Sequence, residues 1–219
     1  TGEGSEDGQE VKYFSDTACY IYTKLEANKK YHFYSVLGPN KRTFTINDDG
    51  VSFKDTNTTP EGVAVSTTGI YRIKFDFDDA SAKVEKIDKL EIYVAWPQRR
   101  NELAYIGKGV WELKDYNVSL TSTSWGFDER YKFIFTTNGK EEHWGQIPSL
   151  FSDPRPAINK VGYRDMAPDP ENKTDQWGGK MFKFPNELCD GADLDRYFTD
   201  ITVFMTADKN YTHDFSNIR

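Results

Sequence analysis

Residues 124–145 read SWGFDERYKFIFTTNGKEEHWG, and this stretch carries the pattern on which the fold depends. A strand-forming run at residues 130–136 is followed by a polar turn, and a Trp-Gly pair flanks it on each side, at Trp125 and Trp144. A buried indole normally contributes a large apolar area to a core, yet Trp144 lies in a very polar segment. The stretch predicts a hairpin whose Trp144 either covers the end of a core or offers a flat platform to a ligand.

The region before this hairpin consists of short alternating runs separated by turn signals. The run at 70–77 places aromatic and apolar residues on one face and mostly charged residues on the other. The run KRTFTI, residues 41–46, ends in the turn sequence NDDG, across which the following run VSFK pairs. Because helical periodicity is almost absent, residues 11–90 are predicted to form a β-sandwich, which typically needs roughly 80–90 residues.

A second unit, residues 91–219, has a different pattern. A glycine break at Gly107 and Gly109 precedes a strand in which Trp111 alternates with charged residues, so Trp111 is predicted to lie in the core. Residues 146–179 contain five of the nine prolines and are interpreted as one long loop. A loop of this length inside a compact domain is typical of a functional segment.

Composition and charge exclude several classes of function. The chain carries 35 Asp and Glu against 28 Lys and Arg, a net charge of −7, which argues against nucleic acid and against adsorption to anionic lipid. Residues 1–10 are acidic, rich in glycine and free of apolar residues, as is typical of a flexible tether. This beginning suggests that a targeting segment once preceded the tether.

Catalytic, metal and cofactor motifs are not recognisable. None of the nucleophile, phosphate-binding, zinc or dinucleotide signatures is present, and the three histidines have no evident nucleophile beside them, so a non-catalytic protein without a cofactor is predicted. Acidic stretches at 169–175 and 190–195 lack the spacing of a calcium loop and are interpreted as solvated, without metal. Cys19 and Cys189 either pair or remain two thiols.

Aromatic residues in polar loops are the strongest functional signal. A sugar has an apolar C–H face and a rim of hydroxyl groups, so its site needs an open ring beside polar side chains. Trp125, Trp144 and Trp177 each lie next to glycine and polar residues and are candidates for stacking. The alternative for each ring is that it covers the end of a core. The polar candidates for the hydroxyl groups are Lys140, Asp175, Gln176 and Lys180.

The runs YIGKGVWEL (105–113), RYKFIF (130–135) and NGKEEHWG (138–145) together resemble the carbohydrate-binding domains of the SusE and SusF outer-membrane lipoproteins. These lipoproteins belong to the starch-utilisation systems of glycan-degrading gut bacteria. The closing strands from 181 to 215 are also similar, and the first unit looks like domains of the same class of surface proteins. By position, Trp144 matches the family's tryptophan after the strand.

The resemblance implies an all-β protein with two tandem β-sandwich domains of the immunoglobulin-like or carbohydrate-binding-module type. It implies a lipid anchor upstream of residues 1–10, location on the outer face of the outer membrane, a monomeric state and non-catalytic capture of an oligo- or polysaccharide. Components of an outer-membrane glycan transporter would be further partners. The alternative is a structural or adhesion protein of the same architecture that holds another protein and keeps its indoles packed inside.

Overall fold

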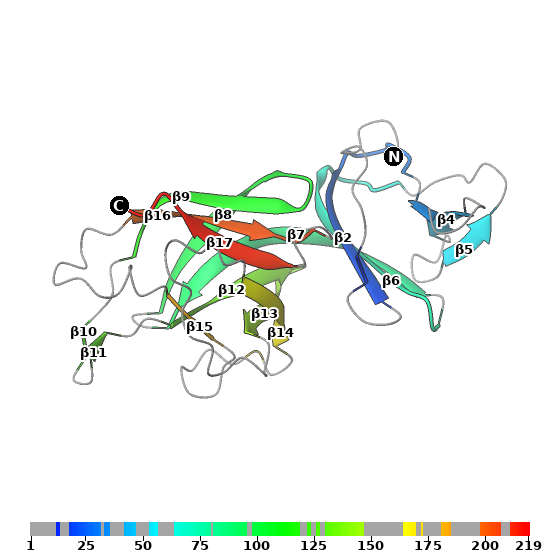
Figure 1. Ribbon diagram of the computed structural model, residues 1–219. Helices are drawn as coiled ribbons and strands as arrows, with labels where there is room; N and C mark the ends of the chain where they lie inside the picture. The colour runs from blue at the N-terminus through cyan, green and yellow to red at the C-terminus, as the bar shows by residue number, and fades with distance from the viewer. Residues whose placement is uncertain are drawn as a thin grey trace. The chain divides into compact units, whose positions relative to one another are not determined.

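The computed structural model is built from β-strands, and no helix occurs in the part of the chain that it describes (Figure 1). The described residues are 12–13, 18–31, 33–35, 42–46, 53–56, 64–79, 81–95, 98–118, 122–123, 126–127, 130–146, 164–169, 172, 181–184, 198–206 and 211–219. The predicted all-β class is therefore confirmed. No described segment is a helix long and apolar enough to cross a membrane. The predicted tether, residues 1–10, lies outside the described residues.

The chain divides into two compact units. The first comprises Thr1–Ile87, Gly107–Gly109 and Thr206–Asp208, and the second comprises Asp88–Ile106, Val110–Met205 and Lys209–Arg219. One long strand, β7 (Ser81–Val94), belongs to both. Its first half pairs with the preceding strand from Ser81 to Ile87, and its second half pairs with the following strand from Leu90 to Val94.

The first unit contains an antiparallel sheet with the order β1-β2-β6-β7 and a second sheet with the order β3-β4-β5. Their bounds are β1 (Lys12–Tyr13), β2 (Ala18–Leu25), β3 (Phe33–Ser35), β4 (Arg42–Ile46), β5 (Phe53–Thr56) and β6 (Gly69–Asp76). Alternation along β2 and β6 sends Ile21, Ile73 and Phe75 into one core, as the sequence pattern predicts. The predicted hairpin across NDDG is confirmed as β4–β5, with Ile46 opposite Phe53.

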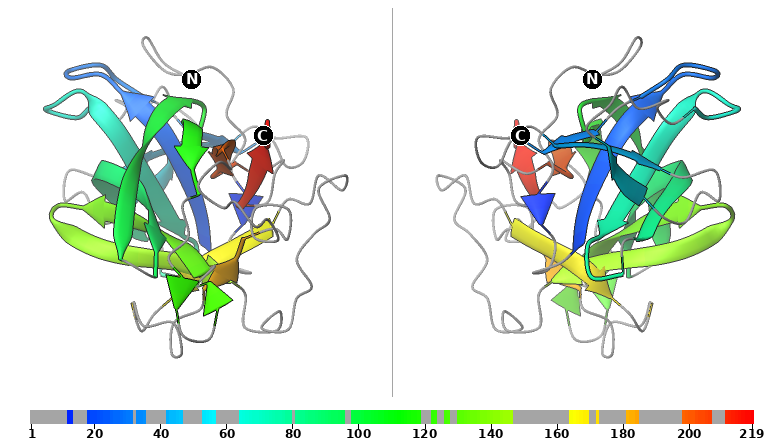
Figure 2. Two further views of the ribbon diagram at one scale, coloured as in Figure 1. Left: turned by 90° about the vertical axis from the view of Figure 1, so that its left-hand side faces the viewer. Right: turned by 90° about the vertical axis from the view of Figure 1, so that its right-hand side faces the viewer.

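The second unit is one antiparallel sheet that closes on itself. Its order is β7-β8-β9-β16-β17-β14-β13-β12-β15, and β12 also pairs with β7, so eight of the described strands form a ring. Two separate packed sheets are expected from the sequence, whereas the pairing here runs on from strand to strand until β12 meets β7 again. Two further views of the strands are given in Figure 2. Closure leaves no open edge among these eight strands. The strand bounds are β8 (Arg99–Gly107), β9 (Val110–Asn117), β12 (Arg130–Thr137), β13 (Lys140–Gln146), β14 (Arg164–Asp169), β15 (Phe182–Lys183), β16 (Phe198–Phe204) and β17 (Thr212–Ser216), with a separate hairpin of β10 (Ser122–Thr123) and β11 (Gly126–Phe127).

Strand β14 corrects one expectation, because it lies inside the segment 146–179 that the sequence predicts to be a loop. It contains Pro168, which argues against a strand in the sequence. From Met166 to Asp169 it pairs with β13, and at Arg164 and Asp165 it pairs with β17. Pro168 therefore stands where pairing is assigned on only one side of the strand, a position that tolerates a residue without an N–H.

Aromatic rings fill the interior of the second unit. Tyr131, Phe133 and Phe135 project from one side of β12 and are fully buried. Phe135 meets Trp111 edge-on at 5.6 Å between ring centres, which confirms Trp111 as a core residue. The hydroxyl of Tyr131 lies 2.7 Å from Nε2 of His213, whose ring is also fully buried. Edge-to-face packing of this kind favours one fixed arrangement of rings.

Cys19 lies in the core of the first unit as a free, buried thiol, and Cys189 lies outside the described residues. Burial raises the pKa of the Cys19 thiol to about 11, against a smaller opposite effect from a hydrogen bond with the Phe75 backbone. The thiol is thus held in its neutral form.

We expect iodoacetamide to label Cys19 slowly in the folded protein and quickly in urea, because only the exposed thiolate reacts. Mass spectrometry of the peptide containing Cys19 measures this separately from Cys189. Since the folded-state pKa lies above the value of about 8.5 for an unfolded thiol, this residue's stabilising effect is complete below that pH and is lost as the pH rises towards 11. Rapid labelling of the folded protein at pH 8 would contradict the buried position.

Candidate functional site

Trp144 is fully buried, which makes its predicted role as an open stacking platform wrong. Its indole Nε1 donates a hydrogen bond to Oε1 of Glu142 at 2.6 Å, and its ring packs edge-on against Phe135 and Tyr211. The physical reason is alternation along β13: Trp144 shares the inward side with Phe133 of β12, whereas its polar neighbour His143 faces outward. The polar surroundings in the sequence therefore belong largely to the other face of the strand.

The remaining predicted site residues are distributed differently. Lys140 is exposed and begins β13 immediately after the turn at Asn138 and Gly139. Trp125, Trp177, Asp175, Gln176 and Lys180 lie outside the described residues, as do the acidic residues at 190–195. Asp169, from the other acidic stretch, is buried in β14 and forms an ion pair. Among the described side chains, no three of His, Cys, Asp or Glu are grouped to hold a metal ion.

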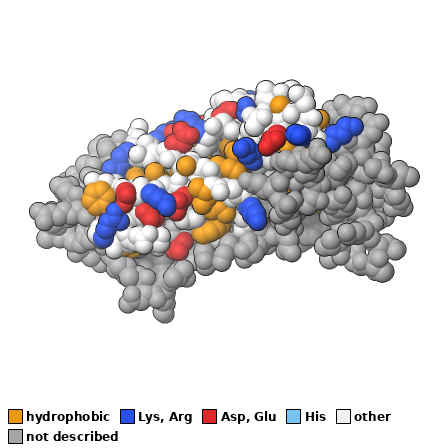
Figure 3. All heavy atoms as spheres, turned by 90° about the horizontal axis from the view of Figure 1, so that it is seen from above, with side chains coloured by type: hydrophobic (Ala, Val, Ile, Leu, Met, Phe, Trp, Pro, Cys, Tyr) orange, Lys and Arg blue, Asp and Glu red, His pale blue; other side chains and the backbone are white. Residues whose placement is uncertain are grey.

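A chain of charged side chains runs across the outward face of β7, β8, β12, β13 and β14, and we call it the outer ion network. The cross-strand register places Tyr93 opposite Arg100, and Ile134 and Asp169 opposite His143, so that these residues share one face. Acidic and basic side chains are interspersed over the face shown in Figure 3. The network consists of Lys89, Glu91, Arg100, Glu141, His143, Lys132 and Asp169.

The inner end of the network is completely enclosed. The side chains of Lys132 and Asp169 are 0% and 2% exposed, and Nζ of Lys132 lies 3.0 Å from Oδ2 of Asp169. The same Nζ lies 3.4 Å from Nδ1 of His143, whose Nε2 lies 3.4 Å from Oε2 of Glu141. Because an ammonium only donates, Nδ1 is the acceptor, and we assign the ring proton to Nε2, which faces a carboxylate.

The outer end of the network is accessible to solvent. Arg100 donates from Nη1 and Nη2 to the two carboxylate oxygens of Glu141, at 2.5 and 3.2 Å, and its Nη1 lies 3.5 Å from Oε2 of Glu91. Its guanidinium also lies 5.5 Å from the centre of the Tyr93 ring. The hydrogen bonds with Glu141 raise the pKa of Arg100 above its ordinary value, and the same bond from Arg100 lowers the pKa of Glu141. Both groups therefore stay charged at neutral pH.

Asn172 fastens the segment after β14 to the network. Its backbone N–H donates to the Asp169 carbonyl at 3.0 Å, and its side-chain amide accepts from the N–H of His143 and donates to the carbonyl of Glu141, at 2.9 and 3.3 Å. The side-chain amide of Asn172 thus bonds to backbone groups of β13 in the way that the backbone of a neighbouring strand would. The backbone of Glu141, which carries one member of the accessible Arg100–Glu141 pair, is therefore held in place.

The two ends of the network support different chemistry. An ammonium sealed from solvent cannot touch a substrate, so Lys132, His143 and Asp169 act within the protein by holding three strands together. Arg100 and Glu141 can form hydrogen bonds with a ligand, since Glu141 is 39% and Arg100 32% exposed. Lys140, the residue that sequence reasoning identifies, is exposed too, but alternation places it on the other face of β13 from Glu141. Sequence reasoning does not find Arg100 and Glu141, because they come from strands far apart in the chain. The sequence signal that points to the network is Lys132, a charged residue inside the strand-forming run RYKFIF.

Compared with models of known protein families and with curated proteins, the chain matches none.

We expect Lys132→Met to reduce the free energy of unfolding by about 3–5 kcal/mol, because it leaves the enclosed Asp169 carboxylate without its ammonium. The double variant Lys132→Met with Asp169→Leu should be less destabilised than either single variant, since it removes both charges together. Urea unfolding followed by circular dichroism measures the three values.

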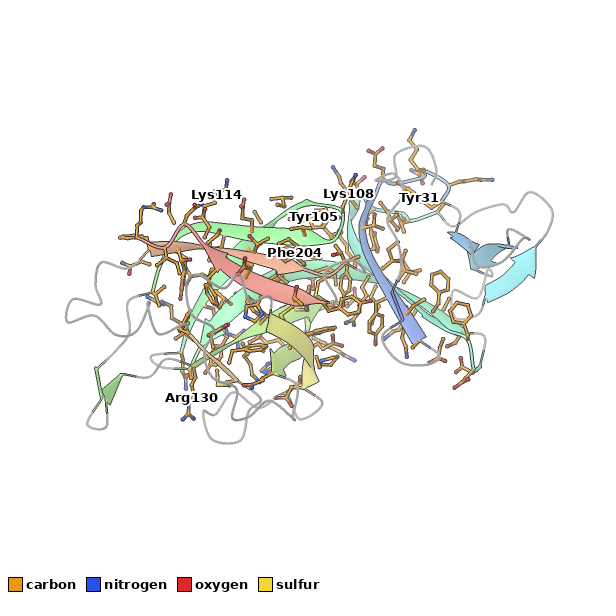
Figure 4. The ribbon with its side chains drawn as sticks, viewed as in Figure 1. Tyr31, Tyr105, Lys108, Lys114, Arg130 and Phe204 are labelled. Carbon is orange, nitrogen blue, oxygen red and sulfur yellow. The ribbon has the colours of Figure 1, made fainter. Side chains whose placement is uncertain are left out.

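Lys114→Met is the control, because Lys114 is 67% exposed and forms only a 3.5 Å surface ion pair with Glu112. Its side chain points away from the sheet, as does that of Arg130 (Figure 4). Loss of a pair of this kind typically costs about 0–1 kcal/mol. A Lys132→Met variant no less stable than Lys114→Met would show that the inner end of the network is not enclosed.

Proposed function

We propose that this chain is a non-catalytic, cell-surface glycan-binding protein that captures an oligo- or polysaccharide. The observation that carries the proposal is the accessible end of the outer ion network, where Arg100 and Glu141 present a charged donor and a charged acceptor. Hydroxyl groups of a sugar need polar partners already held in place, because each side chain that must be ordered on binding lowers the affinity. The salt bridge between Arg100 and Glu141 supplies that order in advance.

The stacking rings of the proposal are Trp125 and Trp177, with Asp175, Gln176 and Lys180 as further polar partners. Trp144 is not among them, because its ring has no open face. The resemblance to SusE and SusF supports the wider setting: tandem immunoglobulin-like or carbohydrate-binding-module-like modules, a lipid anchor at the outer membrane, a monomer, and work beside an outer-membrane glycan transporter.

A second candidate is a structural or adhesion protein that binds another protein. One observation favours it: Trp144 is packed inside its unit, as this alternative predicts for the indoles. The two candidates differ in the role of Trp177 and Trp125, which are open platforms in the first and packed side chains in the second. Removing these rings therefore distinguishes the two.

We expect Trp177→Ala or Trp125→Ala to weaken glycan binding about tenfold, equivalent to about 1.4 kcal/mol, while the fold is retained. Isothermal titration of the whole chain against a panel of neutral and acidic polysaccharides measures this effect. Phe77→Ala is the matched control, because Phe77 is an aromatic side chain, 41% exposed, in the turn after β6. No reducing ends should be released during the titration.

Two outcomes would reject the proposal. The first is that no polysaccharide binds with a dissociation constant below about 1 mM. The second is that both tryptophan variants unfold, or that both bind as well as Phe77→Ala, in which case the rings are core residues or bystanders and the protein-binding candidate is favoured.

A further inference from the structure

Three lysines and one tyrosine stand at successive cross-strand positions in the sheet of the first unit. Lys12 of β1 stands opposite Tyr20 of β2, Tyr20 opposite Lys74 of β6, and Lys74 opposite Lys83 of β7. We call these four register positions the basic row. The opposite face of the same strands holds the apolar core around Ile21, Ile73 and Phe75, so the row lies on the side that is not needed for folding that core.

Like charges placed directly opposite each other on neighbouring strands destabilise a sheet. Lys74 and Lys83 stand in this relation, although the whole chain carries a net charge of −7 and has many acids to place there instead. Tyr20 is the aromatic neighbour of Lys74 in the row. Each of the two lysines also forms an ion pair with a carboxylate on its own strand, which offsets the repulsion between them.

Lys74 and Lys83 each form an ion pair with a carboxylate two residues further along the same strand. Nζ of Lys74 is 3.3 Å from Asp76, and Nζ of Lys83 is 2.5 Å from Glu85. The lysine side chains are 36% and 67% exposed, against 22% for Asp76 and 12% for Glu85. The two lysine side chains are therefore more exposed to solvent than the carboxylates that pair with them.

Glu85 is held in its ionised form at this position. Burial alone would raise the pKa of Glu85, but hydrogen bonds from Lys83 and Arg72 outweigh that effect and hold the pKa below its ordinary value. Arg72 bonds to Glu85 at 2.8 Å and is itself buried. The Glu85 carboxylate that pairs with Lys83 thus keeps its negative charge at neutral and mildly acidic pH.

Tyr20 adds a half-buried ring in the middle of the row. The guanidinium of Arg72 lies 5.7 Å from the centre of this ring, and Tyr22 meets it edge-on at 6.4 Å. The ring is consequently fixed in orientation between the positions of two lysines. A pyranose with an acidic substituent needs this combination, because a flat group supports its ring and an ammonium group pairs with its negative charge.

We propose that the basic row binds the carboxylate or sulfate groups of an anionic polysaccharide. This inference rests on the proposed glycan-binding function and assigns it a substrate class and a place in the first unit. Neighbouring strands are about 4.8 Å apart, so Lys74 and Lys83 present their charges at a spacing comparable with one sugar unit. Nucleic acid or an anionic membrane would need a much broader basic surface than one row bordered by Asp76 and Glu85.

The test compares polygalacturonate and chondroitin sulfate with the neutral glycans pullulan and xyloglucan, using isothermal titration of the whole chain. We expect the anionic polymers to bind more tightly, and their affinity to fall clearly between about 50 and 300 mM NaCl, because salt screens exposed charges. Lys83→Gln should weaken anionic binding about threefold, and Lys74→Gln with Lys83→Gln about tenfold, without changing any neutral affinity.

Lys114→Gln is the matched control. Lys114 has the same 67% exposure as Lys83 and also pairs with a carboxylate two residues away, but it lies on β9 in the second unit. The affinity of the Lys114→Gln variant for the anionic polymers should stay within about twofold of that of the unchanged protein. A loss as large as that of Lys83→Gln would show a general charge effect and overturn the proposal.

The remaining outcomes separate the inference from the function on which it rests. If neutral glycans bind and anionic ones do not, or if the double variant binds anionic polymers normally, the basic row is not the site while the glycan-binding function stands. If no glycan of either class binds, both the inference about the basic row and the proposed glycan-binding function are rejected. Binding to phosphatidylserine vesicles in place of the polymers would overturn the inference in favour of a membrane surface.

Discussion

Closure of the second unit's sheet is the constraint on which the rest of the structure depends. β12 pairs with β13, with β15 and with β7, and the backbone N–H of Ala95 donates to the carbonyl of Arg130 at 3.0 Å. This strand is buried on both faces, with Phe133 on the inward side and Ile134 on the outward side, both fully enclosed. An isolated hairpin would leave one of these faces in water, where its apolar residues would be destabilising.

The enclosed charges of the outer ion network are a second consequence of this closure. Lys132, His143 and Asp169 come from three adjacent strands and meet on one face. Moving one strand by a single residue would turn its whole set of side chains over and direct a charge into the aromatic interior. Taking an ion pair out of water is costly, and such pairs often contribute little net stability. We infer that this one contributes chiefly by excluding the wrong register.

The sequence predicts the all-β class and the strands with alternating polarity well, because the alternation of apolar and polar residues is a local property. It identifies Trp111 as a core residue, and it predicts that Tyr71, Ile73 and Phe75 share the core face of β6. It does not predict that Phe77 of the same pattern lies exposed in the turn after β6. It does not predict the closed ring, because the pairing of β12 with β7 joins residues far apart in the chain. β14 is missed for a different reason: it contains Pro168, which argues against a strand in the sequence, and it depends on pairing with β13.

The candidate site is predicted less well than the fold. The polar neighbours of Trp144 suggest an open ring, but strand alternation separates the ring from His143 and leaves the ring inside. Lys140 is found because it is exposed next to a turn, whereas the partnership of Arg100 with Glu141 spans two strands that sequence reasoning does not bring together. Both proposed binding surfaces thus consist of charges on outward sheet faces, which become visible only once the register is known.

Hydrogen exchange at the amide of Ala95 tests the closed sheet most directly. If β7 and β12 are paired, this amide should exchange as slowly as the amides in the middle of β12 and β13, because it opens only when the ring opens. Nuclear magnetic resonance resolves the individual amides. Exchange at Ala95 as fast as that of an exposed turn, with β12 and β13 still protected, would contradict the closed sheet and the register of the outer ion network with it.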